Sequence, residues 1–304
     1  MNRSVFIVCA LLLAQAATAE ALWTAESELR ASDADSYSWL LSVDRSLGER
    51  GLIYVTVRES QVDAEGADLD TGSRVLGGMY RLNETWRLSA HAERWGRRGD
   101  IRADRLSSTL SGNGEQFGLS LIAGMRWITL SAGAPARSPG NGDNGPPFGI
   151  PVDPGDDDEE NGDRVAEDFD LKARQLGIRG RWFLDDQWTL VAGLNWDSYD
   201  RNPGDLAARE AIEQLSSSAV TLAQSFRDRG LFFEVRHDFG EFRELSVYLA
   251  RDRSAVDGRR ADTLALSWIQ PMADAWDVRL EVGRTRTEDF DPTHFVGVGL
   301  TWYP

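Results

Sequence analysis

The chain has 304 residues and a formal net charge of −16 at pH 7, from 33 lysines and arginines against 49 aspartates and glutamates. This acidic balance argues against nucleic acid or an anionic lipid surface as a partner. No run of about 18 apolar residues follows residue 20, so the sequence also excludes a membrane-spanning helix.

The first stretch, 1–19, has the pattern of a secretory signal peptide. Arg3 supplies a basic start, an apolar run follows, and Ala17-Thr18-Ala19 is a small-residue cleavage site. The only cysteine, Cys9, lies within this stretch. We therefore predict an exported chain, 20–304, that forms one domain without disulfides.

Along the chain, apolar and polar residues alternate in segments of about ten, a pattern that predicts β-strands with one apolar face. The strands expected in the first half are 22–30, 36–44, 52–59, 74–82, 86–95, 117–123 and 127–133. The last two should pair around a tight turn at Gly124-Met125, and we place 105–110 in a polar loop, 96–114. The strands expected in the second half are 175–183, 188–198, 231–239, 244–251, 263–270, 276–284 and 295–303.

The links between these strands alternate between two lengths. The short ones are 45–50, 83–85, 124–125, 184–187, 240–242 and 271–275. The long ones are 61–72, 96–114, 134–168, 199–229, 252–261 and 286–293. Such asymmetry is typical of barrels with short periplasmic turns and long external loops. It predicts an all-β, transmembrane, up-and-down antiparallel barrel of about 14 strands, with 12 or 16 as alternatives.

The last segment supports this architecture. Val296, Val298, Leu300 and Trp302 alternate with polar residues or glycine. The segment resembles the closing strand of a bacterial outer-membrane β-barrel of porin-like type. The resemblance implies a place in the outer membrane of a Gram-negative bacterium, contact with its lipid, external long loops and periplasmic termini. Tryptophans and phenylalanines near the short links fit a periplasmic aromatic girdle.

The polar face of the strands is the first candidate site, because it would line the lumen. The candidate pore-lining residues are Arg87, Glu93, Arg126, Arg179, Arg181, Glu234, Arg236, Arg279 and Glu281. One interpretation is an ordinary polar lining in which Glu234 and Arg236 pair with Arg179, Arg181 or Glu244. The other is a ladder of arginines opposite acids that biases permeation by charge. Both agree with a passive channel for small polar solutes.

The 199–229 link contains a second candidate. Apolar residues at spacings of three and four, from Ala208 to Phe226, predict one helix over 205–228 with Gly230 as its stop. It would lie against the outer rim, constrict the lumen or dock a partner. The alternative function is therefore a surface-interaction or structural barrel that this helix closes.

The 134–168 link contains an acidic run. Asp157, Glu159, Asn161 and Asp168 fall at positions one, three, five and twelve of a partial EF-hand-like loop, which makes Ca²⁺ a candidate ligand. The departures at positions three and twelve favour a solvated acidic loop instead. We expect no other cofactor.

Catalysis is the remaining alternative, since some outer-membrane barrels are hydrolases. The histidines are His91, His237 and His294, and only His91 shares the polar face with a carboxylate, Glu93. No serine–histidine or paired aspartate arrangement is evident, so we do not expect an enzyme.

Overall fold

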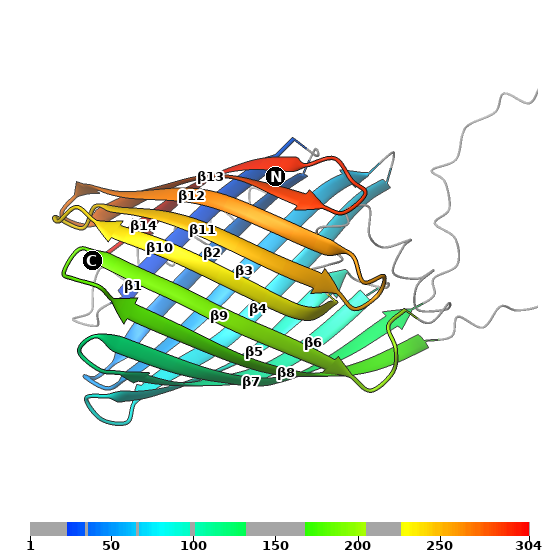
Figure 1. The fold of residues 1–304 in the computed structure, drawn as a ribbon, viewed down its shortest axis with the longest axis horizontal. Helices are drawn as coiled ribbons and strands as arrows, with labels where there is room; N and C mark the ends of the chain where they lie inside the picture. The colour runs from blue at the N-terminus through cyan, green and yellow to red at the C-terminus, as the bar shows by residue number, and fades with distance from the viewer. Residues whose placement is uncertain are drawn as a thin grey trace, which may run out of the picture.

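The computed structural model describes residues 23–33, 36–64, 67–97, 101–131, 168–204 and 226–303, and these form a closed antiparallel barrel. Each strand pairs with its neighbours in sequence, and β1 closes the ring with β14 (Figure 1). The strands are β1 (Trp23–Ser32), β2 (Ser36–Leu47), β3 (Gly51–Ala64), β4 (Ala67–Arg81), β5 (Trp86–Arg97), β6 (Ile101–Asn113), β7 (Phe117–Ser131), β8 (Asp168–Phe183), β9 (Trp188–Tyr199), β10 (Arg227–Asp238), β11 (Glu244–Ser254), β12 (Arg260–Ala273), β13 (Trp276–Thr287) and β14 (Thr293–Trp302).

The strands run obliquely to the long axis of the barrel. In Figure 1 the near wall, β8–β12, slants one way and the far wall, β2–β6, slants the other way, as closure of a sheet with tilted strands requires. The predicted 14-stranded up-and-down barrel is therefore confirmed. Within the described part of the chain, no helix is long and apolar enough to cross a membrane.

Two adjacent predictions were wrong, and their errors cancel in the strand count. Residues 105–110 lie within β6, not in a loop, and 117–133 is not a hairpin. Instead β7 runs unbroken through Gly124-Met125. The alternation on β7 keeps one phase from Leu121 through Met125 to Trp127, whereas a tight turn would have interrupted it.

Several links are shorter than predicted because the strands extend further. β3 and β4 pair up to Ala64 and Ala67, so most of the predicted loop 61–72 is strand. β10 begins at Arg227, which makes the end of the predicted 205–228 helix a strand start. Residues 205–225 lie outside the described part of the chain.

The outer face carries the apolar side chains, which are half exposed because no other described residue covers them. Leu76, Leu121, Leu176 and Val298 are 62, 49, 62 and 53% exposed. Aromatic residues of the same face gather next to the short links, at Trp86, Trp182, Trp188, Phe239, Trp276 and Trp302. An apolar band that ends in aromatic residues is the surface that a bilayer covers.

The wall is not equally tall all round. β7 and β8 have 15 and 16 residues, whereas β1 and β14 have 10 each. At the end with the short links, Trp23 pairs with Arg45 and Trp302 pairs with Trp276. The described chain therefore begins and ends at that end of the barrel, and the extra length of β7 and β8 raises the other rim.

Two consecutive apolar residues of β7 test which face meets lipid. Leu121 points outward between Leu110 and Ile178, while Ile122 belongs to the inner wall. We expect Leu121→Arg to lower the free energy of unfolding in lipid vesicles by about 2–4 kcal/mol, and Ile122→Arg by clearly less. Guanidinium titrations followed by tryptophan fluorescence measure both. An equal or greater loss for Ile122→Arg would contradict the assignment of the faces.

Candidate solute path through the barrel

The inner wall carries polar and charged side chains along every part of the ring. The structure places all nine candidate pore-lining residues on this face, because each alternates with outward apolar neighbours. Their surroundings differ, however. Some are neutralised by an ion-pair partner, while others have no such partner among the described residues.

Three of the arginines have no carboxylate at ion-pair distance among the described residues: Arg87 on β5, and Arg179 and Arg181 on β8. Ser111 and Ser120 lie between Arg87 and Arg179 in the register and bond to each other at 2.9 Å. These small residues leave room for the long side chains on either side. We call Arg87, Arg179 and Arg181 the arginine wall.

A recess of about 280 Å³ opens beside the arginine wall, lined by Arg179, Arg181, Arg236, Phe232 and Tyr248 among others. The Arg179 guanidinium lies 5.0 Å from the centre of the Phe232 ring, a cation–π contact. Phe232 and Tyr248 stack with ring centres 6.1 Å apart. The recess thus combines positive charge with flat apolar surface.

Arg236 is neutralised on its own strand. It donates from Nε and Nη2 to the two carboxylate oxygens of Glu234, both at 2.9 Å. The guanidinium presents two N–H groups that match the two carboxylate oxygens. Two residues that lie two positions apart on one face of a strand can therefore form a bidentate pair. The sequence offered Arg179 and Arg181 as partners of Glu234, but neither lies within ion-pair distance of it; Glu234 pairs with Arg236.

The opposite side of the ring is rich in acids. β1 lies seven strands from β8 in either direction and β12 lies seven strands from β5, so β12–β14 and β1 face the arginine wall, with β2 next to them. Glu26, Asp44 and Asp277 gather there near the short links. Further along, Glu281 accepts from Arg30 at 2.9 Å and lies 3.5 Å from Arg279. The lumen therefore has a positive side and a negative side.

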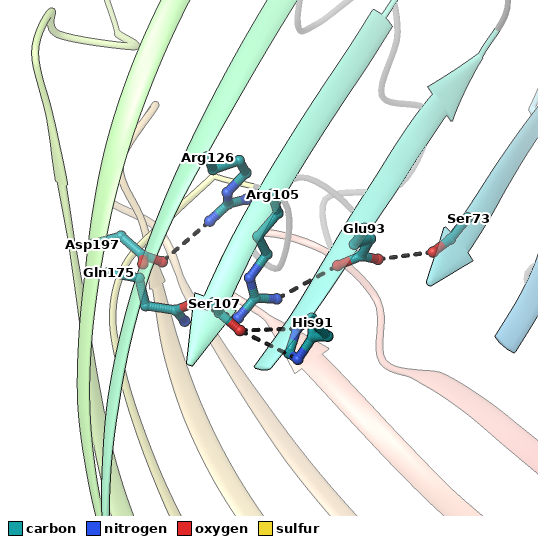
Figure 2. A network of polar contacts seen from close by, with 8 residues as sticks. All are labelled: Ser73, His91, Glu93, Arg105, Ser107, Arg126, Gln175 and Asp197. Carbon is teal, nitrogen blue, oxygen red and sulfur yellow. Dashed lines mark hydrogen bonds and ion pairs between the residues drawn. The ribbon is translucent and has the colours of Figure 1, made fainter. Parts of the chain in front are cut away.

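A polar network joins the inner faces of six consecutive strands, β4 to β9 (Figure 2). Ser73 donates to Glu93 at 2.8 Å, Arg105 lies 3.6 Å from Glu93, and Arg105 also donates to Gln175. His91 bonds to Ser107 Oγ at 2.9 Å. In this network the candidate Glu93 is held by Ser73 and Arg105.

The network continues to a buried carboxylate. Asp197, whose side chain is 0% exposed, lies 3.4 Å from Arg126 and 3.5 Å from Arg227. Arg227 also contacts Asp252 at 3.5 Å. Sequence reasoning missed Arg105 because it placed 105–110 in a loop, and missed Arg227 because it placed this residue in a helix.

An apolar cluster fills part of the lumen at the end with the long links. Its buried members are Ala103, Ile128, Leu171, Phe226 and Val256, with Trp95, Phe169 and Tyr199 packed against them. Phe226 and Val256 come from two different links, and the Ala255 amide donates to the Phe226 carbonyl at 2.6 Å. The described ends of these links therefore fold inward and narrow this mouth.

The other two histidines are not part of this polar network. His237 faces outward between Trp188 and Phe239, with ring centres 4.3 Å from each. His294 donates from Nδ1 to Asp33 at 2.7 Å, and this bond holds the pKa of Asp33, which lies beyond the end of β1, below its usual range. No three described metal-ligating side chains are placed to hold an ion.

Of the predicted Ca²⁺ ligands, Asp168 is the first residue of β8. Asp157, Glu159 and Asn161 lie outside the described part of the chain.

Solved structures share this architecture. No protein-family model matches the chain, and no curated protein matches it in sequence. The barrel superposes on the CymD monoaromatic hydrocarbon channel with a TM-score of 0.54 at 8% identity, covering 94% of this chain and 89% of that one. The chain has the fold of the outer-membrane channel barrels.

Two further solved structures are similar to this chain. A bacterial polysaccharide outer membrane secretin gives a TM-score of 0.50 at 8% identity, covering 93% of this chain and 97% of that one. KdgM porin gives 0.44 at 8% identity, covering 92% and 98%. At such identity the similarity is one of fold, so the role of the lumen has to be argued from its own side chains.

The buried carboxylate of the network yields a test of what holds the inner wall together. Asp197→Ala removes the buried carboxylate that Arg126 and Arg227 share, and we expect it to lower the free energy of unfolding by about 3–5 kcal/mol. Asp104→Ala is the matched control, because Asp104 pairs with Arg94 and Arg102 on the exposed outer face. For Asp104→Ala we expect the free energy of unfolding to fall by at most about 1 kcal/mol. Equal losses in denaturant titrations would refute the role given to Asp197.

Proposed function

We propose that the protein is a porin-like passive channel of the outer membrane for small polar solutes, with a preference for anions along the arginine wall. The fold supports a membrane-spanning barrel, and a wall of 14 strands leaves space for an aqueous lumen. In this proposal the short links face the periplasm and the long links face outward, as in outer-membrane barrels generally.

The observation that carries the proposal is the unpaired state of Arg87, Arg179 and Arg181. A lining that served stability alone would neutralise its charges, as Arg236 with Glu234 and Arg126 with Asp197 do. Arg87, Arg179 and Arg181 have no such partner among the described residues, and Arg179 and Arg181 line a recess of about 280 Å³. Together with the acids on the opposite side, they create a field across the path of a solute.

The test is ion selectivity in a planar bilayer. We expect the refolded protein to conduct steadily, and we expect the triple variant Arg87→Gln, Arg179→Gln, Arg181→Gln to shift its reversal potential in a KCl gradient toward cations. Glu26→Gln with Asp277→Asn should shift it the opposite way. The physical reason is that each change removes one side of the transverse field.

A matched control separates the lumen from overall charge. Arg260→Gln, Arg284→Gln and Arg286→Gln remove the same charge from the outer face, and selectivity should stay that of the wild type. An equal shift in both triple variants would contradict a role for the arginine wall. A folded wild-type barrel that conducts no ions would refute the channel itself.

The inward-folded links support a second candidate, a barrel closed at its outer mouth that serves surface interaction or structure. Phe226 and Val256 are 2% and 8% exposed although both belong to links, so this end is narrowed by packing. Removal of 205–225 separates the two functions. Conductance that begins only in this deletion would favour the closed barrel, and equal conductance with and without the segment would favour the open channel.

A further inference from the structure

The two arginines that β8 contributes to the arginine wall contact aromatic rings and not acids. Measured from Cζ to the ring centre, Arg179 lies 5.0 Å from Phe232 and Arg181 lies 6.0 Å from Phe183. Neither arginine has a hydrogen bond or an ion pair with another described residue. A guanidinium carries five N–H donors in one plane, so each of these cations is held in place by a ring and still lacks an acceptor.

A glycine determines where the Phe232 ring lies. Gly193 on β9 stands between Phe232 on β10 and Arg179 on β8 in the register. A Cβ atom on Gly193 would lie 2.4 Å from Phe232 Cε1, so the ring covers the place where a side chain would be. On the other side of Phe232, Tyr248 of β11 stacks with it at an angle of 26°. Both rings are half-buried, and together they form a flat surface beside Arg179.

The other charges around the recess of about 280 Å³ cancel in pairs. Arg236 is bonded to Glu234 at 2.9 Å, and Arg227 lies 3.5 Å from Asp252. The lining thus has four arginines against two carboxylates, and the positive charge that is left belongs to the two arginines of β8. The recess therefore attracts an anion to one side, next to the flat surface of the two rings.

A second recess, of about 390 Å³, shares Tyr248 with the first and provides a comparison. It also contains an arginine over a ring, since Arg30 lies 4.9 Å from the centre of Phe295. Here, however, Arg30 donates to Glu281 at 2.9 Å, and Arg279 lies 3.5 Å from the same carboxylate. The cations of the second recess are therefore already paired, while those of the first are not.

We propose that the first recess binds aromatic monocarboxylates, with the carboxylate at Arg179 and Arg181 and the ring against Phe232 and Tyr248. Guanidinium groups bind a carboxylate through charge-assisted hydrogen bonds, and aromatic rings stack on one another. The uncharged polar side chains in the lining are those of Asn195 and Tyr248, which suits a solute with an apolar body better than one with many hydroxyl groups. The inference rests on the proposed function, because it names the class of solute that the anion-preferring path would take.

Equilibrium dialysis of the refolded barrel in detergent tests the proposal, with benzoate and cyclohexanecarboxylate as probes. The two acids have the same charge and a similar size, but only benzoate has an aromatic face. We expect the wild type to bind benzoate about tenfold more tightly than cyclohexanecarboxylate. Phe232→Leu should remove this preference by weakening benzoate binding about tenfold. Arg179→Gln with Arg181→Gln should weaken the binding of both acids about a hundredfold.

Phe295→Leu is the matched control, because its ring also lies under an arginine but in the recess whose cations are paired. We expect this variant to bind both acids as the wild type does. Benzyl alcohol has the ring without the carboxylate and should bind to the wild type about a hundredfold more weakly than benzoate. Far-ultraviolet circular dichroism checks that every variant keeps the barrel.

Three results would overturn the proposal: equal affinity of the wild type for the two acids, an equal loss of benzoate binding in Phe232→Leu and Phe295→Leu, or no binding of benzoate by the folded wild type. Dialysis measures binding without conductance, so it fails separately from the channel. A barrel that conducts but does not bind benzoate would refute the recess alone. A barrel that binds benzoate with this pattern but does not conduct would refute the channel alone.

Discussion

The structure depends on one constraint, which is that every strand must find a backbone partner on both sides. In hydrocarbon an unpaired amide or carbonyl costs several kcal/mol, so a sheet with free edges cannot span a membrane. The pairing of β1 with β14, from Ala25 opposite Trp302 to Ser32 opposite Phe295, removes both edges. Once the ring is closed, the alternation of each strand decides which side chains meet lipid and which meet the lumen.

The sequence carried enough information for this architecture because alternation is a local signal. The prediction from alternation failed in a strand whose outward face is only weakly apolar. The outward residues of β6 include Arg102, Asp104 and Ser108 besides two leucines, so the strand resembled a polar loop. In β7, the glycine at 124 suggested a turn although the apolar phase ran straight through it. The even strand count survived because one strand was lost and another was split.

The candidate site was predictable in part for a related reason. Alternation tells which face a residue occupies, so Arg87, Arg179 and Arg181 were assigned to the inner wall from the sequence. Which arginine forms an ion pair with which carboxylate depends on the register between strands and on carboxylates that two arginines share. No local sequence pattern encodes either of these. Asp197 shows the difference, since the two arginines beside it come from β7 and from the start of β10, far apart in sequence. The contrast between neutralised and unpaired arginines therefore emerges only from the fold.

The unequal strand lengths have a consequence for access to the lumen. β8 is six residues longer than β1 (16 against 10), which adds roughly 20 Å of wall measured along the strand. The opening at the end with the long links is accordingly uneven, and β1 and β14 form its lowest part. In the proposed channel, a solute that enters over this lower part passes Arg30 and Glu281 first and reaches the arginines of β8 afterwards. The order in which charges are met is thus set by the shape of the opening as well as by the lining.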